Sequence, residues 1–382
     1  RLPRAGVDWA PQATPREVPM DTHSRLTIRG VRARGLNLSL LRPVETASGV
    51  MKTTPLVLVD LETEEGVTGR SYVRCYTPVA LQPLVQLVAN LQGLLAGEAA
   101  VPAAIEQKLQ RHFRLLGPQG LTGVAMAGID MALWDARAKA CGVPLVTLLG
   151  GEPRPIPAYA SLRTMSPQGA TAEAEEVLAQ GFTALKVKIG RGTLAADLET
   201  IRAVRRAVGD GVRLMVDYNQ SLPVAEAIDR ARVLDDEGLY WIEEPTRADD
   251  FEGHARIAAA ARTAIQLGEN WWGVADMAKS LAAGASDHVM LDVMKLGGVS
   301  AWLRAAALAQ ASSLLASSHT FPEISAHLLG VTPTGHWLEY LDHAGPILAE
   351  PIRIKDGHAV IPDRPGSGLD WNEEVIQRVL AG

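Results

Sequence analysis

The chain has 382 residues, of which 47% are hydrophobic and 21% are charged, as is typical of a globular protein. Its length predicts roughly two domains, and its net charge of −6 offers no basic surface for nucleic acid or for an acidic membrane. No apolar run approaches the roughly 20 residues that a membrane-spanning helix needs. Two cysteines, Cys75 and Cys141, are too few for a disulfide framework, so we expect a protein of the reducing cytoplasm.

The first part of the chain has the pattern of an antiparallel sheet. Residues 1–20 contain several prolines and no hydrophobic stretch of a secretion signal, so they are interpreted as an extension ahead of a natural start near Met20. Alternating apolar and polar residues over 26–41, and further runs at 55–61 and 67–73, predict a meander of strands.

The segment between the first two strands, 42–54, is rich in threonine, serine and glycine, and we interpret it as a mobile flap. Helical patterns follow the third strand, and the last of them ends at Gly142 with Pro144 beyond it. These helices are expected at 79–96, 103–115 and 120–141. Strands followed by helices predict an α+β domain over residues 21–150.

The pattern changes after Gly150 and Gly151, where short apolar runs begin to alternate with alanine-rich amphipathic segments. This alternation predicts an α/β fold, a (β/α)8 barrel of the TIM type, over residues 151–350. The expected strands lie at 155–161, 183–189, 213–218, 239–243, 264–268, 287–291, 313–317 and 336–340. The last segment, 351–382, returns to short strands and is expected to pack back on the first domain.

Three acidic residues stand at equal intervals, each at the end of one of these apolar runs. Asp217 precedes Glu243 by 26 residues, and Glu243 precedes Glu269 by 26 residues. That spacing matches a strand, a helix and short loops, so the three carboxylates are expected to converge at the barrel mouth. Buried anions repel one another unless a cation joins them, and oxygen ligands without Cys or His favour Mg²⁺. The sequence therefore predicts a magnesium site.

The alternation of side chains along a strand gives two further expectations. Alternate residues share a face, so Asn219 is expected beside Asp217. Glu243 and Glu244 are neighbours in sequence, and parity indicates that only one of them points inward without saying which. Glu244 therefore remains an alternative metal ligand.

Lys186 and Lys188 lie two residues apart in the second predicted strand, and parity directs both side chains into the barrel. Two ammonium groups so close disfavour each other's protonation, and desolvation adds to this effect. One lysine is therefore expected to be neutral at about pH 7 and to act as a base. A solvated strand end is the alternative interpretation of such a motif, and the buried character of the strand disfavours it.

His319 ends the seventh predicted strand, and Asp292 ends the sixth. We expect Asp292 to accept the imidazole N–H and so to fix the tautomer and raise the basicity of the ring. The strands of Lys188 and His319 lie on opposite sides of the ring, so a substrate between them would meet a base on each face. Glu339 ends the eighth strand and is expected to be protonated easily, ready to donate a hydrogen bond to a developing oxyanion.

Together these motifs resemble those of the mandelate racemase/muconate lactonizing enzyme family of the enolase superfamily. The resemblance runs from about Leu26 to the C-terminus and includes residues 128–135 of the first domain. Its motifs in chain order are Lys186-Val-Lys188, Met215-Val-Asp-Tyr-Asn-Gln220, Trp241-Ile-Glu-Glu-Pro245, Gly268-Glu-Asn270, Asp292 with Lys295-Leu-Gly-Gly298, Ser317-Ser-His319 and Trp337-Leu-Glu339.

The resemblance implies that the three spaced acids bind Mg²⁺, which holds the carboxylate and α-hydroxyl of a 2-hydroxy acid and stabilises an enediolate. Lys188 would move the α-proton on one face, and the His319–Asp292 pair would move it on the other. The first domain would cap the barrel, with its flap closing over the substrate.

The resemblance also implies supporting roles for other polar residues. Lys186 and Glu339 would bind the carboxylate oxygens and stabilise the enediolate. Asn219 and Ser161 would supply further polar contacts to the substrate. A small hydroxy acid or sugar acid is the expected partner, and a homo-oligomer is the expected assembly.

Two positions depart from the aromatic pocket that binds mandelate in this family. Arg74 stands where that pocket has a phenylalanine, and Thr320 stands where it has a leucine. A buried guanidinium against a phenyl ring is costly unless it is stacked or paired. We therefore expect Arg74, Tyr76 and Thr320 to contact a substrate that carries a polar or second acidic group.

Three functions are compared on this basis. The preferred hypothesis is a racemase of 2-hydroxy acids. An acid-sugar dehydratase that forms a 2-keto-3-deoxy acid begins with the same enediolate, with His319 protonating the departing β-hydroxyl. A barrel that only binds a metal or a sugar acid would be expected to lack a base or a ligand, and no such gap occurs here.

Overall fold

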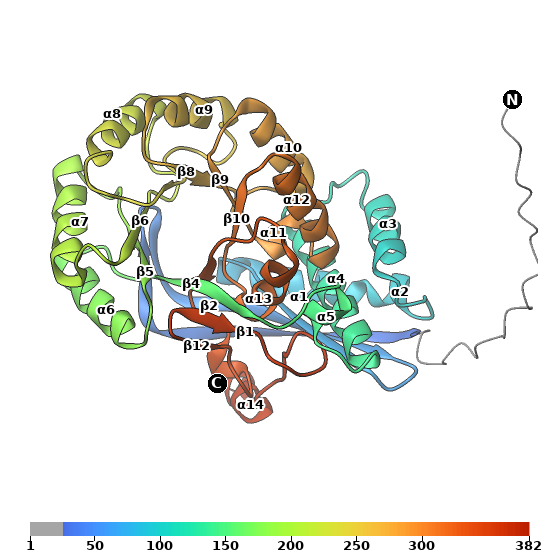
Figure 1. The fold of residues 1–382 in the computed structure, drawn as a ribbon. Coiled ribbons are helices and arrows are strands. Elements are labelled where there is room, and N and C mark those ends of the chain that lie inside the picture. Colours follow the sequence, from blue (N-terminus) through green and yellow to red (C-terminus); the bar gives the residue numbers. More distant parts are fainter. Residues whose placement is uncertain (1–25, 382) are drawn as a thin grey trace, which may run out of the picture.

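The computed structural model describes residues 26–381, so the extension expected at residues 1–20 lies outside the described part. Among the helices of this range, none combines the length and the apolar character that a membrane crossing requires. The chain forms a small sheet flanked by helices, a barrel, and a C-terminal segment that returns to both (Figure 1).

The N-terminal part is a three-stranded antiparallel sheet in the order β1-β2-β3, followed by helices. It matches the meander and the helices expected from the sequence. Its elements are β1 (Ile28–Thr46), β2 (Gly49–Thr63), β3 (Thr68–Arg74), the 3-10 turn η2 (Pro78–Ala80), α1 (Leu81–Asn90), α2 (Gln92–Leu95), α3 (Pro102–His112), α4 (Gly120–Ala140) and α5 (Leu145–Leu148).

Strands β1 and β2 form one long hairpin. At its root, residues 56–59 are fully buried, so both faces of the sheet are covered there. The pairing is interrupted between Ser39 and Val44 and then resumes with Val44 opposite Met51 and Thr46 opposite Gly49. Most of the segment interpreted as a flap, 42–54, therefore continues the two strands as the hairpin tip.

Helix α4 packs closely against strands β2 and β3 because small residues line the contact. A Cβ atom on Gly69 would lie 2.0 Å from the backbone oxygen of Ala132, and one on Gly128 would lie 3.2 Å from Val73 Cγ1. Glycine at these two positions lets the helix and the sheet approach without steric overlap. The root of the hairpin is thus held by the core of the N-terminal part.

The rest of the chain closes a (β/α)8 barrel, which confirms the expected fold. Strand order runs β10-β9-β8-β7-β6-β5-β4, all parallel, and β11 closes the ring beside β4. The elements are β4 (Pro155–Ser161), α6 (Pro167–Ala179), β5 (Ala184–Lys188), α7 (Leu194–Val208), β6 (Arg213–Asp217), α8 (Val224–Leu234), β7 (Ile242–Glu243), α9 (Phe251–Ala260), β8 (Ile265–Leu267), α10 (Gly273–Ala283), β9 (His288–Leu291), α11 (Val293–Leu296), α12 (Val299–Ala311), β10 (Leu315–Ser318), α13 (Pro322–Val331), β11 (Leu338–Tyr340) and the 3-10 turn η3 (Gly345–Ile347).

The hairpin tip lies at the mouth of the barrel. Figure 1 draws the hairpin in blue, passing the barrel strands with its tip beside β5 and β6. The Arg191 guanidinium, in the loop after β5, donates to the carbonyl of Thr46 at 2.8 Å, and the backbone N–H of Glu45 donates to the carbonyl of Arg163 at 2.7 Å. The tip is therefore tied to the loops that follow β4 and β5.

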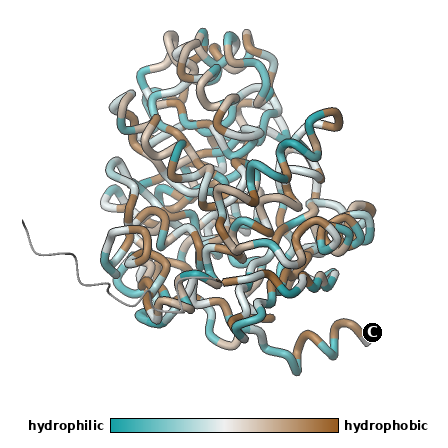
Figure 2. Tube along the Cα trace, turned by 90° about the vertical axis from the view of Figure 1, so that its right-hand side faces the viewer, coloured by the Kyte–Doolittle hydropathy of each residue, from teal (hydrophilic) through white to brown (hydrophobic). Residues whose placement is uncertain are grey.

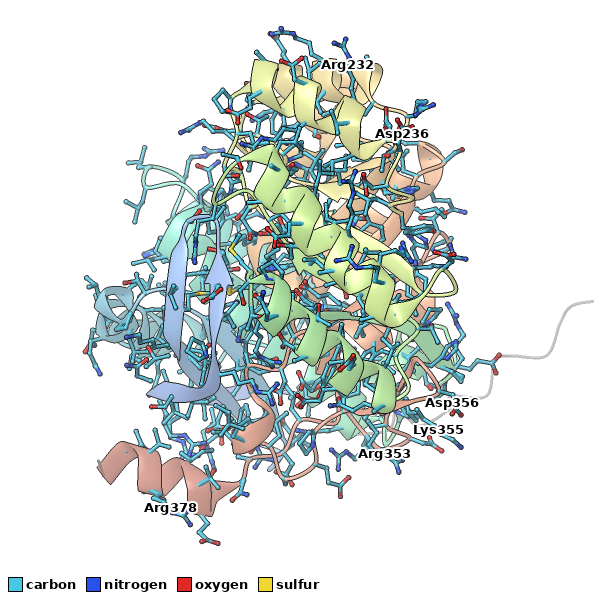
Figure 3. The ribbon with its side chains drawn as sticks, turned by 90° about the vertical axis from the view of Figure 1, so that its left-hand side faces the viewer. Arg232, Asp236, Arg353, Lys355, Asp356 and Arg378 are labelled. Carbon is cyan, nitrogen blue, oxygen red and sulfur yellow. The ribbon has the colours of Figure 1, made fainter. Side chains whose placement is uncertain are left out.

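The C-terminal segment divides between the two parts of the molecule. Strands β12 (Arg353–Lys355) and β13 (His358–Val360) form a hairpin that pairs with β4 of the barrel. Figure 3 shows its labelled residues on the side of the barrel away from the β1–β2 hairpin. The indole of Trp371 donates to Asp60 of β2 at 2.6 Å, and α14 (Glu373–Ala381) extends from the body (Figure 2). From Gly366 onward the segment packs on the N-terminal part, as expected, whereas the β12–β13 hairpin pairs with the barrel instead.

Candidate active site

A pocket of about 390 Å³ opens at the carboxyl ends of the barrel strands, under the hairpin tip. In a barrel of this kind, side chains at these strand ends face one common mouth. Of the residues predicted for the site, those that line the pocket are Arg74, Tyr76, Lys186, Lys188, Asp217, Asn219, Glu269, His319 and Glu339.

Three carboxylates meet beside this pocket, and two of them, those of Asp217 and Glu269, line it. Asp217 ends β6, Glu243 ends β7 and Glu269 follows β8, and one oxygen of each lies within 4.8 Å of the others. Burial raises the pKa of Asp217 and of Glu243 although the Lys186 ammonium lowers both. A buried group of carboxylate oxygens, with neither nitrogen nor sulfur, fits the ligand preference of Mg²⁺.

The structure distinguishes Glu243 from its neighbour. Glu244 is buried near the site, where burial first and then the charges of Glu269 and Asp217 raise its pKa, but it does not belong to the group of carboxylate oxygens that lie within 4.8 Å of one another. Its two carboxylate oxygens instead accept from the Asn270 amide at 2.9 and 2.7 Å. Glu243 is therefore the member of this pair that the fold brings to the metal group.

Lys186 is a buried cation among acids. Its ammonium lies 2.5 Å from Glu243 Oε1, 2.8 Å from Glu339 Oε1 and 3.7 Å from Asp217 Oδ2. Burial lowers the pKa of Lys186, but the surrounding carboxylates, led by Glu243, raise it well above the ordinary value. Lys186 is therefore protonated and suited to bind an anion.

The pKa of Lys188 shifts in the opposite direction to that of Lys186. Burial first, and then the Lys186 ammonium, lower the pKa of Lys188. Its amine donates to Ser161 Oγ at 2.8 Å and to the Leu162 carbonyl at 3.2 Å. A neutral amine that donates both of its hydrogens keeps a lone pair free to accept a proton. The direction of this shift agrees with the expectation that the pKa of one of the two lysines is lowered.

His319 is oriented by Asp292. The distance from His319 Nδ1 to Asp292 Oδ2 is 2.6 Å, so the carboxylate accepts the Nδ1 hydrogen and leaves Nε2 for the pocket. Nε2 lies 3.4 Å from Glu269 Oε2. Burial lowers the pKa of His319, but Glu269, then the bond to Asp292, raise it above its ordinary value.

Glu339 differs from its expected ionisation state. Burial raises its pKa, but the cations Lys186, His319 and Lys188 outweigh burial and hold the pKa well below its usual range. Its second oxygen accepts from the backbone N–H of Thr320 at 3.1 Å. The expectation of an easily protonated acid is therefore wrong for this arrangement, in which Glu339 is a paired carboxylate.

Asn219 and Ser161 lie near the acids and bases as expected, but they face different partners. The Asn219 amide donates to Asp217 Oδ2 at 2.8 Å and borders the pocket. Ser161 is buried, and its hydroxyl accepts from Lys188, so its first effect is on the amine rather than on a bound molecule.

The two positions that depart from the family pattern fall in different environments. Arg74 lines the pocket, with its guanidinium 4.5 Å from the centre of the Tyr76 ring. Thr320 is buried, has a φ of 47°, and does not line the pocket. The expectation that Thr320 contacts the substrate is therefore not supported, because its left-handed backbone directs the side chain into the protein.

Lys295 and Asn270 also lie near the site, although the sequence predicted no separate role for either of them. Lys295 is buried, hydrogen-bonds to the Asn270 side-chain oxygen, and lies 4.6 Å above the Tyr76 ring. Asn270 in turn donates to Glu269 at 3.1 Å. The signal in the sequence was the position of Asn270 directly after a predicted ligand.

Comparisons with known proteins agree with this geometry. A family model described as "Mandelate racemase / muconate lactonizing enzyme, N-terminal domain" matches residues 30–150, and one described as "Enolase C-terminal domain-like" matches residues 169–375. The chain is 33% identical over 347 residues to a 3,6-anhydro-alpha-L-galactonate cycloisomerase of Streptomyces coelicolor, which covers 89% of this chain and 96% of that protein.

Two similar solved structures contain bound magnesium. An enolase from Bradyrhizobium complexed with magnesium and mandelic acid is 46% identical, covers 93% of this chain and 98% of its own, and superposes with a TM-score of 0.88. An L-talarate/galactarate dehydratase from Salmonella typhimurium LT2, liganded with Mg and L-lyxarohydroxamate, is 28% identical, covers 98% and 97%, and has a TM-score of 0.88.

Proposed function

This chain belongs to the mandelate racemase / muconate lactonizing enzyme family, and we propose that it racemises a 2-hydroxy carboxylic acid by a two-base mechanism. The coarser function is Mg²⁺-dependent removal of a proton next to a carboxylate by an enzyme of the enolase superfamily. Mg²⁺ supplies a positive charge that holds the substrate carboxylate and offsets the charge that develops as the proton leaves.

One observation carries the proposal: Lys188 and His319 border the same pocket, yet Lys188 ends β5 and His319 follows β10. With its depressed pKa, Lys188 takes the α-proton of one enantiomer as a neutral amine. His319, held through Nδ1 by Asp292, offers Nε2 to the other enantiomer. A racemase needs both, because one base removes the proton and the other returns a proton on the opposite face.

The remaining residues position the substrate. Lys186 stays protonated and binds a carboxylate oxygen, which withdraws electron density from the α-carbon as the proton leaves. Glu339 fixes Lys186 through the 2.8 Å ion pair, and Asn219 holds Asp217 in place. Ser161 anchors the Lys188 amine.

The test follows the α-hydrogen of each enantiomer by NMR in D2O with Mg²⁺ present. We expect Lys188→Ala to stop exchange of one enantiomer and His319→Asn to stop exchange of the other. Both variants should lose racemisation while the opposite exchange remains measurable. Loss of both exchanges in a single variant that still binds Mg²⁺ would contradict the two-base mechanism.

A second candidate function is dehydration of a sugar acid to a 2-keto-3-deoxy acid. The buried Arg74 in the pocket and the similarity to an L-talarate/galactarate dehydratase favour it. In that case His319 protonates the departing β-hydroxyl instead of the α-carbon. Accumulation of a 2-keto acid without exchange in the wild-type protein would select this function over racemisation.

We also propose a homo-oligomer located in the cytoplasm, with a small hydroxy acid or sugar acid as partner. The small-acid partner is supported by mandelic acid and L-lyxarohydroxamate in the similar structures. Sedimentation of the purified protein tests the assembly, since a single species at the mass of one chain would contradict it.

A further inference from the structure

Lys295 is a buried cation to which the proposed reaction assigns no role. It lies on α11, three residues after Asp292, and only 7% of it is exposed. It does not line the catalytic pocket, and it borders instead a separate pocket of about 290 Å³ among α3, α4, α10 and α12. A buried charge is costly unless it has partners, so the contacts of Lys295 indicate its role.

The contacts of Lys295 lead to two residues that do line the catalytic pocket. Its ammonium donates to Asn270 Oδ1 and lies 4.6 Å from the centre of the Tyr76 ring. Burial lowers the pKa of Lys295, but the groups around it, led by Tyr76 and Asp292, raise it above its ordinary value. Lys295 is therefore protonated at neutral pH and can only donate hydrogen bonds.

The side-chain amide of Asn270 bridges two acids at the metal site. Its nitrogen Nδ2 donates to both carboxylate oxygens of Glu244, at 2.9 and 2.7 Å, and to Glu269 Oε1 at 3.1 Å. Glu269 is one of the three grouped carboxylates, and its other oxygen, Oε2, lies 3.4 Å from His319 Nε2. The bond from Asn270 to Oε1 therefore restricts how the Glu269 carboxylate can turn.

Lys295 helps to fix which way this amide faces. The oxygen of a primary amide only accepts hydrogen bonds, and its nitrogen only donates them. With the Lys295 ammonium on one side and carboxylate oxygens on the other, only one orientation of the Asn270 amide satisfies both neighbours. The reversed orientation would turn the amide nitrogen toward the ammonium and the amide oxygen toward the acids. Without Lys295 the amide oxygen would lose this partner, and the acids alone would hold the orientation.

We propose that Lys295 is a positioning residue of the magnesium site, which acts through Asn270 to hold Glu269 in the orientation that binds the ion. The Tyr76 ring contacts the same ammonium from the N-terminal part, so both parts of the molecule contribute to the arrangement. Residues that orient a metal ligand change the affinity for the metal although they do not touch it. The inference rests on the magnesium site of the proposed function, and it holds for racemisation and for dehydration alike.

Calorimetric titration with Mg²⁺, before any acid is added, tests the inference without requiring turnover. Lys295→Met keeps the length of the side chain but removes its charge, and it should weaken Mg²⁺ binding about 10-fold. Asn270→Ala should weaken it about 10- to 100-fold, because it removes the group that contacts the ligand. Since Lys295 acts through Asn270, the double variant should bind Mg²⁺ as Asn270→Ala alone does, whereas independent effects would multiply.

Three further variants complete the test. Lys295→Arg should restore most of the Mg²⁺ affinity, because a guanidinium also only donates, stacks on aromatic rings, and has the pocket of about 290 Å³ beside it for its larger head. Lys295→Gln serves if Lys295→Met does not fold, and it should also weaken binding, since a neutral amide can accept as well as donate. Lys279→Met is the matched control, because this exposed lysine of α10 pairs with Asp276 and should leave Mg²⁺ binding unchanged.

Thermal unfolding of each variant without Mg²⁺ checks that the fold is kept. Wild-type Mg²⁺ affinity in the folded Lys295→Met or Lys295→Gln variant would overturn the inference. Effects that multiply in the double variant, or an arginine variant that binds as weakly as the methionine variant, would overturn it as well. Failure of the proposed function appears separately, as a wild-type protein that binds Mg²⁺ but leaves the α-hydrogen NMR signal of every acid intact in D2O.

Discussion

Asp292 uses its two carboxylate oxygens for two different tasks: Oδ2 lies 2.6 Å from His319 Nδ1, and Oδ1 accepts the backbone N–H of Lys295 at 2.8 Å. The second bond caps the short helix α11, so the carboxylate that orients the imidazole is itself fixed by the backbone. This arrangement lets the role of the carboxylate in orienting His319 be separated from its structural role.

Asp292→Asn tests that separation. Asparagine is also a favourable N-cap, so we expect the fold to be retained. Loss of the charge should slow exchange of the His319-dependent enantiomer by roughly 10- to 100-fold, as with other residues that orient a catalytic histidine. Exchange through Lys188 should stay close to wild type. Equal slowing for both enantiomers, measured by NMR in D2O, would show that Asp292 acts on the whole pocket.

Removal of the metal should abolish turnover. We expect EDTA to stop exchange of both enantiomers and added Mg²⁺ to restore it, because the substrate carboxylate and the acids otherwise repel. Asp217→Asn should weaken Mg²⁺ binding measured by calorimetry. Asp249→Asn is the control, since among the described residues this exposed acid forms an ion pair with Arg247 alone. Equal Mg²⁺ affinity in the two variants would contradict the assignment of the ligands.

The two bases should give different pH profiles. Lys188 acts when neutral, and its pKa is lowered from 10.5, so its exchange rate should rise with pH and level off below 10.5. His319 also acts when neutral, and its pKa is raised from 6.5. The exchange rate that depends on His319 should therefore rise with pH, with the midpoint of the rise above pH 6.5. Exchange rates of each enantiomer from about pH 5 to pH 11 measure both limbs. A Lys188 limb at or above 10.5 would contradict the depressed pKa.

Arg74 should decide the preference between polar and aromatic substrates. We expect weak or no activity of the wild-type protein on mandelate, because a phenyl ring would leave the buried guanidinium unpaired. Arg74→Phe should lower kcat/KM for an acid with a distal carboxylate by roughly 10- to 100-fold, as loss of a charged hydrogen bond does, and raise it for mandelate. Wild-type turnover of mandelate as fast as that of the polar acid would show that Arg74 does not contact the substrate.

The close contact of α4 with the sheet should be sensitive to a single methyl group. Gly69→Ala places a Cβ 2.0 Å from the backbone oxygen of Ala132, so we expect a loss of about 1–3 kcal/mol in the free energy of unfolding. Gly93→Ala is the control, because its Cβ would meet no atom of residues 26–381 within 4 Å. Urea unfolding followed by circular dichroism measures both. Equal stability of the two variants would mean that the helix moves away at no cost.

The barrel was predictable because its signal is periodic and local. Each strand needs only a short apolar run, and the spacing of Asp217, Glu243 and Glu269 follows from the repeating unit. The burial of Lys186 and Lys188 followed from parity within one extended strand.

Parity failed where the backbone leaves the extended conformation. Glu244 directly follows β7 and has a positive φ, and its carboxyl lies near Glu269 and Asp217 although parity directed only one of the two glutamates inward. Thr320, whose place was predicted from the family resemblance, also has a positive φ and does not line the pocket. Such left-handed turns are rarely visible in sequence when the residue is not glycine or asparagine. The ionisation of Glu339 could not be predicted from the sequence either. It depends on the 2.8 Å contact with Lys186 of β5, a strand far from β11 along the chain.

The root and the tip of the β1–β2 hairpin have different roles, one in the core and one at the catalytic pocket. The root is fixed by the buried residues 56–59, whereas the tip contributes Val44 and Met51 to the wall of the catalytic pocket. Substitutions in the tip can therefore alter which acid is accepted without disturbing the metal ligands or the bases, all of which the barrel supplies. Evolution can thus diversify substrates in this architecture by changing one hairpin end, and exchanging that end between relatives is a direct route to transfer specificity.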